Sequence, residues 1–75
     1  MTRTLSIIAR DIRKDWKNIY FGARPYVDAM ASLDSISDAY GADSARGIVQ
    51  YFLANASAWR GPVARTIKAE LKAML

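Results

Sequence analysis

Residues 4–20, TLSIIARDIRKDWKNIY, decide the fold of this 75-residue chain. At the 100° step of an α-helix, the apolar side chains of this stretch fall on one narrow stripe and the basic ones fall opposite. The stripe consists of Leu5, Ile8, Ile12, Trp16 and Ile19. The opposite side carries Arg3, Arg10, Arg13, Lys14 and Lys17. The pattern predicts an amphipathic helix over 4–20 that packs its apolar stripe on a core.

Glycine and proline divide the remaining chain into three more segments with helical periodicity, 25–40, 43–58 and 62–75. Proline suits the first turn of a helix, where two of these segments begin, and Asp43 is a good N-cap for the third. No stretch alternates with period two for long enough to indicate a strand. The sequence therefore predicts one all-α domain over 1–75, a compact bundle of four short helices. If the second helix breaks near 33–35, the bundle has three.

The third segment is apolar over a wide arc, which is typical of the central helix of a bundle. The arc consists of Ile48, Val49, Phe52, Leu53 and Ala56. Because Phe52 lies at its centre, we expect this side chain to be among the most buried. Gly47 costs the helix about 1 kcal/mol relative to alanine, so we expect a close helix crossing at that position.

The composition excludes several classes of chemistry. The chain has no cysteine and no histidine, which removes disulfides, thiol nucleophiles, Cys/His zinc sites and histidine acid–base catalysis. The serines have no histidine to activate them, and no glycine-rich phosphate loop is present. We therefore expect a protein that is not an enzyme, without metal or cofactor. No window approaches 18 apolar residues, so the expected location is cytoplasmic, with no membrane partner.

The net charge of +4 is unevenly distributed. Residues 1–20 contain five basic and two acidic residues, 21–45 contain one basic and four acidic, and 46–75 contain five basic and one acidic. Two interpretations follow: the acidic segment neutralises the basic ones within the fold, or the basic helices face a shared polyanion.

The candidate binding residues lie on the first and fourth helices. For the first helix, the five cations opposite the stripe form an ordinary solvated face, a phosphate-binding face or a face that binds a partner protein. For the fourth, the turn at 59–62 could belong to a helix-turn-helix motif. The candidate contacts of that motif are Arg60, Arg65, Thr66 and Lys68, and Lys72 is a further candidate on the fourth helix. The alternative is that Gly61 and Pro62 simply separate two helices while Trp59 packs in the core.

The chain is rich in large aromatic side chains, which could stack on nucleobases or fill a small core. Tyr51 lies off the main stripe of its helix. It is therefore a candidate exposed anchor in a protein interface.

Much of the chain resembles short, uncharacterised helical proteins encoded by phages and prophages. The N-terminal part of the resemblance is residues 12–17, IRKDWK. The C-terminal part consists of Asp43-Ser44, Ile48-Val49, Tyr51-Phe52-Leu53, Asn55-Ala56, Trp59-Arg60-Gly61, Ala64-Arg65, Ile67-Lys68 and Glu70-Leu71. The resemblance implies a small phage-type accessory protein, working in the host cytoplasm, that binds a macromolecule. It implies no activity and no functional residues.

Two functional hypotheses follow. The first is a non-catalytic module that binds DNA, RNA or a nucleoprotein through the basic first and fourth helices. The second is a protein-binding module that acts on a host protein or forms a homodimer, since one small core supplies only about 3–5 kcal/mol of stability.

Overall fold

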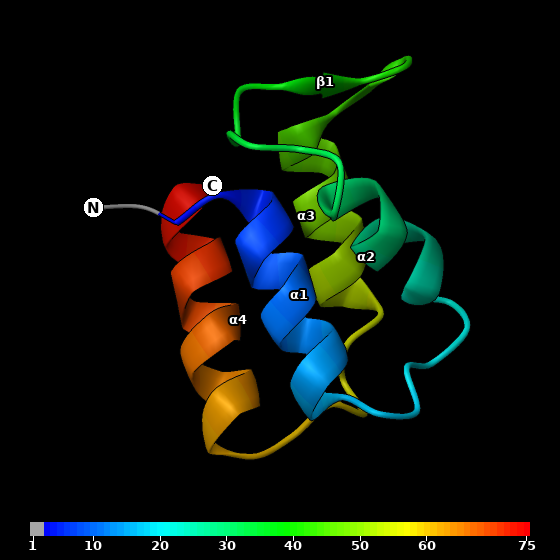
Figure 1. The fold of residues 1–75 in the computed structure, drawn as a ribbon, viewed down its shortest axis with the longest axis vertical. Helices are drawn as coiled ribbons and strands as arrows, with labels where there is room; N and C mark the ends of the chain where they lie inside the picture. Colours follow the sequence, from blue (N-terminus) through cyan, green and yellow to red (C-terminus); the bar gives the residue numbers. More distant parts are fainter. Residues whose placement is uncertain (1–2) are drawn as a thin grey trace.

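The computed structural model describes residues 3–75 as a bundle of four helices with one short hairpin (Figure 1). The elements are α1 (Leu5–Asp15), α2 (Arg24–Met30), β1 (Ala39–Tyr40), β2 (Asp43–Ser44), α3 (Ala45–Ala54) and α4 (Pro62–Met74). The prediction of a helical bundle is confirmed, but the chain is not purely α-helical because β1 and β2 form a two-stranded antiparallel sheet. Within 3–75, no helix combines the length and the apolar character needed to cross a membrane.

Helix α1 begins at a side-chain cap, which the sequence pattern did not indicate. The Thr4 hydroxyl accepts a hydrogen bond from the backbone N–H of Ile7 at 3.2 Å, and this satisfies one of the free donors of the first turn. Two further N–H groups of that turn donate to the carbonyls of Asp34 and Leu33, at 3.0 and 2.9 Å. The segment after α2 therefore closes the start of α1.

The predicted end of the first helix at residue 20 is wrong. The backbone leaves the helix at Trp16, with φ −92° and ψ 84°. Ile19 lies in the following loop but still packs against the core. The prediction that Ile19 faces the core is therefore confirmed, and the prediction that it is helical is wrong.

The predicted second helix over 25–40 is also wrong beyond its first half, because α2 ends at Met30. Short polar side chains after this point form local hydrogen bonds that compete with a helix. The Ser32 hydroxyl donates to the Ala29 carbonyl at 2.9 Å. The Asp38 carboxylate accepts from the backbone N–H groups of Asp34 and Ser35, and these bonds lower the pKa of Asp38.

The hairpin explains why the third helix starts two residues later than predicted. Gly41 occupies the left-handed region with φ 61°, in the two-residue turn between β1 and β2. Ser44, rather than the predicted Asp43, is the N-cap, and its hydroxyl accepts from the Gly47 N–H at 3.0 Å. The expected helix crossing at Gly47 is absent among residues 3–75: a Cβ there would meet only the Ser44 hydroxyl, at 3.3 Å.

The core lies between all four helices, and Phe52 is fully buried in it, as predicted. The main packing contacts run between α2 and α3, α1 and α2, α1 and α4, and α3 and α4. Helix α3 is therefore one side of a ring rather than its centre, which corrects the prediction of a central third helix. Its outer side exposes Arg46, Gln50 and Ala54. The helix ends at Ala54, not at 58.

Candidate nucleic-acid interface

The cations proposed from the sequence separate into two groups in the fold. Three of them form polar contacts within the molecule, namely Arg3, Arg13 and Lys68. The others are exposed, namely Arg10, Lys14, Lys17, Arg60, Arg65 and Lys72. A shared phosphate-binding face on the first and fourth helices would need the cations between those helices to be free.

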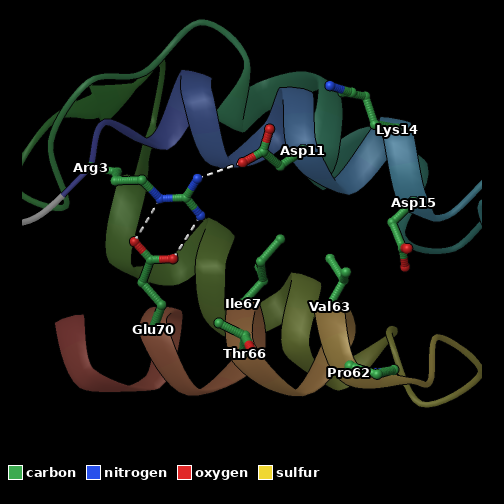
Figure 2. Close-up of a pocket in the computed structure, with 9 residues that line it drawn as sticks. All are labelled: Arg3, Asp11, Lys14, Asp15, Pro62, Val63, Thr66, Ile67 and Glu70. Carbon is green, nitrogen blue, oxygen red and sulfur yellow. Dashed lines mark hydrogen bonds and ion pairs between the residues drawn. The ribbon is translucent and has the colours of Figure 1, made fainter.

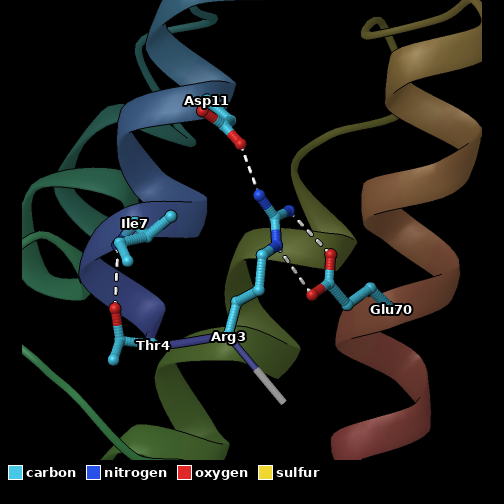
Figure 3. Close-up of polar contacts among 5 residues, drawn as sticks. All are labelled: Arg3, Thr4, Ile7, Asp11 and Glu70. Carbon is cyan, nitrogen blue, oxygen red and sulfur yellow. Dashed lines mark hydrogen bonds and ion pairs between the residues drawn. The ribbon is translucent and has the colours of Figure 1, made fainter. Parts of the chain in front are cut away.

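Arg3 is not free, because it joins α1 to α4 (Figure 3). Its Nε and Nη2 donate to the two carboxylate oxygens of Glu70, at 3.0 and 2.7 Å, and its Nη1 donates to Asp11. This two-pronged pairing is the strong form of an ion pair. The hydrogen bond from Arg3 holds the pKa of Glu70 below its ordinary value, although partial burial opposes this effect.

The groove between α1 and α4 has a mixed charge. It has a volume of about 670 Å³ (Figure 2). Its lining residues are Arg3, Asp11, Lys14, Asp15, Pro62, Val63, Thr66, Ile67 and Glu70. Three carboxylates thus stand against two cations, and the Lys14 side chain points away from α4. This groove does not offer a polyanion the cationic surface that the sequence suggested between these two helices.

Lys68 is a structural cation. Its ammonium group donates to the carbonyls of Ala56 and Trp59, at 2.7 and 2.6 Å. Partial burial, with the nearby charges of Lys72 and Arg60, lowers its pKa. The Trp59 ring that it approaches is itself buried. The expectation that Trp59 packs in the core at this turn is therefore confirmed.

A different groove, between α1 and α2, is cationic. It has a volume of about 280 Å³ and is lined by Arg13, Trp16, Lys17, Ile19, Arg24 and Asp28. Arg13 donates to Asp28, which joins the two helices. Lys17 and Arg24 are exposed, and no ion pair is found for either among residues 3–75. The α1–α2 groove therefore presents three cations against one carboxylate.

The sequence reasoning missed Arg24. This residue is the only cation in the acidic segment 21–45, so averaging charge over the segment hid it. One feature of the sequence could have identified Arg24. It directly precedes Pro25, which marks the start of the second helix, so Arg24 was expected in the connection that follows the basic first helix.

The α1–α2 groove reaches the loop between α1 and α2, because Lys17 and Ile19 of that loop line it. The loops that join α1 to α2 and α3 to α4 both lie at the lower end in Figure 1. A hollow of about 270 Å³ lies where they meet, between Tyr20 on the first loop and residues 54–58 at the end of α3 and in the second. Arg60 belongs to the second loop. We call this region, with Arg13, Lys17, Arg24 and Arg60, the cationic end.

Tyrosine side chains gather on a separate surface. Tyr26 and Tyr51 stack with ring centroids 5.5 Å apart, and Tyr51 is 56% exposed. Together with Tyr40 of the hairpin they line a groove of about 520 Å³ between α2, α3 and the hairpin. The exposure expected for Tyr51 is confirmed.

Comparison of the chain with protein-family models, curated proteins and solved structures finds no match. Among residues 3–75, no three acidic side chains are grouped closely enough to hold a metal ion.

Proposed function

We propose that the protein is a non-catalytic accessory module, of the phage type that its sequence resembles, and that it binds nucleic acid at the cationic end. The observation that carries this proposal is the excess of cations around the α1–α2 groove, where Arg13, Lys17 and Arg24 face the single carboxylate of Asp28. Asp28 neutralises the charge of Arg13. The free positive charge of the groove therefore comes from Lys17 and Arg24. Exposed lysine and arginine side chains of this kind bind phosphates by releasing counterions.

The second loop and the start of α4 support the same location. Arg60 lies in the loop, and Arg65 follows in the first turns of α4. Both side chains are exposed. They add exposed positive charge to the α3–α4 loop and to the start of α4. This arrangement keeps part of the predicted role of the fourth helix, but moves the contact from the groove between α1 and α4 to one end of the bundle.

Fluorescence anisotropy with labelled single-stranded and duplex DNA and RNA tests this proposal. If about four phosphates are neutralised, log affinity should fall against log salt with a slope of about −3 to −4. Lys17→Gln with Arg24→Gln should move the slope toward zero by about 1.4–1.8. The matched control is Arg46→Gln with Lys72→Gln, which removes the same charge from exposed positions outside the cationic end. Equal effects of both pairs, or no binding at 50 mM salt, would contradict the proposal.

The tyrosine groove favours a second candidate function, a protein-binding surface. Tyrosine is enriched in interface hot spots because its ring supplies a large contact area and its hydroxyl a polar contact. Tyr51 and Tyr40 are exposed beside a groove that also contains Pro25 and Ile48. Sedimentation of the wild type and Tyr51→Ser over a range of concentrations tests self-association. Pull-down after nuclease treatment, compared with the same variant, tests a host-protein partner.

A further inference from the structure

The loop between α1 and α2 presents two exposed aromatic rings, and cations precede and follow them in the sequence. Phe21 is 78% exposed and Tyr20 is 45% exposed, and their ring centroids lie 4.8 Å apart. Lys17 precedes the pair and Arg24 follows it, and both line the α1–α2 groove. A phenylalanine side chain stabilises a fold when it is buried. The fold obtains little of this stabilisation from Phe21, so packing does not account for a phenylalanine at the tip of the loop.

Several contacts hold the loop in one conformation. The Tyr20 carbonyl accepts hydrogen bonds from the N–H groups of Ala23 and Arg24, at 2.9 and 3.2 Å. Ala23 is fully buried. The Tyr20 ring lies so close to Gly22 that a Cβ at Gly22 would overlap it, and Asn55 at the end of α3 closes the same space. These contacts fix the backbone of the loop and the Tyr20 ring, which lowers the entropic cost of binding.

We propose that this loop makes the cationic end a site for single-stranded nucleic acid, an inference that rests on the function proposed above. A base stacks on the exposed face of Phe21, and the phosphates on either side contact Lys17 and Arg24. Stacking on an aromatic side chain needs an unpaired base, because the bases of a duplex already stack on one another. The cations of the adjacent α1–α2 groove favour a polyanionic strand over an apolar peptide.

The hollow beside Tyr20 gives the neighbouring nucleotide a place to lie. It is lined by Tyr20, Ala54, Asn55, Ser57 and Ala58, which combine an aromatic face with polar side chains. It lies between the aromatic loop and the residues at the end of α3 and in the α3–α4 loop. The strand would therefore cross the end of the bundle from one loop to the other.

The experiment compares a labelled 12-nucleotide poly(dT) or poly(U) strand with a duplex of the same length at 50 mM salt. The wild type should bind the single strand more tightly. Phe21→Ala should weaken that binding about 5- to 160-fold, the equivalent of about 1–3 kcal/mol for one stacked base, with less than about twofold effect on the duplex. Phe21→Trp should retain the affinity. Tyr40→Ala removes another exposed aromatic side chain, on the hairpin, and should change nothing.

The possible failures are distinguishable. Binding of duplex and single strand with equal affinity, or full single-strand affinity in Phe21→Ala, would overturn the stacking inference while leaving a nucleic-acid-binding module. The stacking inference would also be overturned if poly-glutamate bound as tightly as the single strand and if Lys17→Gln, but not Phe21→Ala, weakened that binding. Charge alone would then explain the binding of the single strand. No binding to any oligonucleotide would overturn both this inference and the proposed function.

Discussion

The indole rings of Trp16 and Trp59 stack in parallel, with centroids 5.6 Å apart and planes within 3° of each other. Trp16 ends α1, and Trp59 lies in the loop between α3 and α4. Both rings meet Phe52 edge-on at 6.3 Å. The indole N–H of Trp59 donates to the Asp15 carboxylate at 2.8 Å. These rings therefore attach the α3–α4 loop to the end of α1 and to the core of α3.

Trp59→Ala should leave the protein largely unfolded. Removal of a buried tryptophan costs about 3–5 kcal/mol, which equals the stability that a core of this size supplies. Circular dichroism at 25 °C should show little helix in the variant. Phe21→Ala removes an exposed ring and should melt like the wild type. A cooperative wild-type melt for Trp59→Ala would mean that the stacked pair is not part of the stabilising core.

Lys68→Met should destabilise the fold by about 1–3 kcal/mol, because the carbonyls of Ala56 and Trp59 lose their ammonium donor. Methionine keeps the length and most of the apolar stem of the side chain. Lys72→Met on the exposed side of α4 is the control and should change stability by less than about 0.5 kcal/mol. Urea denaturation measures both. Equal midpoints for the two variants would show that these hydrogen bonds contribute nothing to folding.

Helix boundaries marked by a residue such as proline were predicted well. Boundaries set by local side-chain hydrogen bonds that compete with the helix were not. Helix α4 begins at Pro62, as proline placement indicates. By contrast, Leu33 and Ile36 keep helical spacing although the backbone there is a series of turns. Both side chains still pack on the core. Apolar spacing therefore identified what is buried, while local hydrogen bonds from Ser32 and Asp38 decided the backbone.

The candidate site was predicted only in part, since long-range partners decide which cations are free. Arg3 and Glu70 are 67 positions apart in the chain, so no spacing rule relates them. Arg13 pairs with Asp28, which realises one of the two interpretations of the charge pattern, neutralisation by the acidic segment. Lys17 and Arg24 come together because the chain leaves α1 at Trp16, a break that apolar periodicity did not indicate.

The contact between Arg3 and Glu70 should make stability depend on pH in the acidic range. The hydrogen bond from Arg3 lowers the pKa of Glu70 in the folded state below its ordinary value of 4.5. The folded state therefore binds this proton less readily than the unfolded state. The contribution is fully present above the ordinary pKa and is lost as the pH falls through the lower folded value.

Glu70→Gln isolates this effect. Between pH 6 and pH 3, the wild type should lose more stability than the variant, by less than about 1 kcal/mol because the pair is partly exposed. Urea midpoints at the two pH values give the difference. Identical pH dependence in the two proteins would exclude a stabilising role for the contact.

Charge reversal at Arg13 should be repaired by reversal at Asp28. Arg13→Asp places two carboxylates together between α1 and α2, whereas Arg13→Asp with Asp28→Arg restores an opposite pair. Because both side chains are exposed, the coupling should be about 0.2–1 kcal/mol. A double-mutant cycle from urea denaturation measures it. Additive effects of the two substitutions would mean that this pair does not help to join α1 and α2.

Gly61→Ala should destabilise the protein by about 1–3 kcal/mol through backbone strain alone. Gly61 precedes α4 with φ 111° and ψ 178°, a conformation that side chains with a Cβ rarely adopt. A Cβ at this position would meet no atom within 4 Å, so crowding adds nothing to the cost. Gly41→Asn is the matched substitution, because Gly41 has φ 61° and asparagine tolerates that region. Urea denaturation should show a clear loss for Gly61→Ala and a smaller one for Gly41→Asn. If the order were reversed, the turn into α4 would be able to relax, and the position of Trp59 would not depend on Gly61.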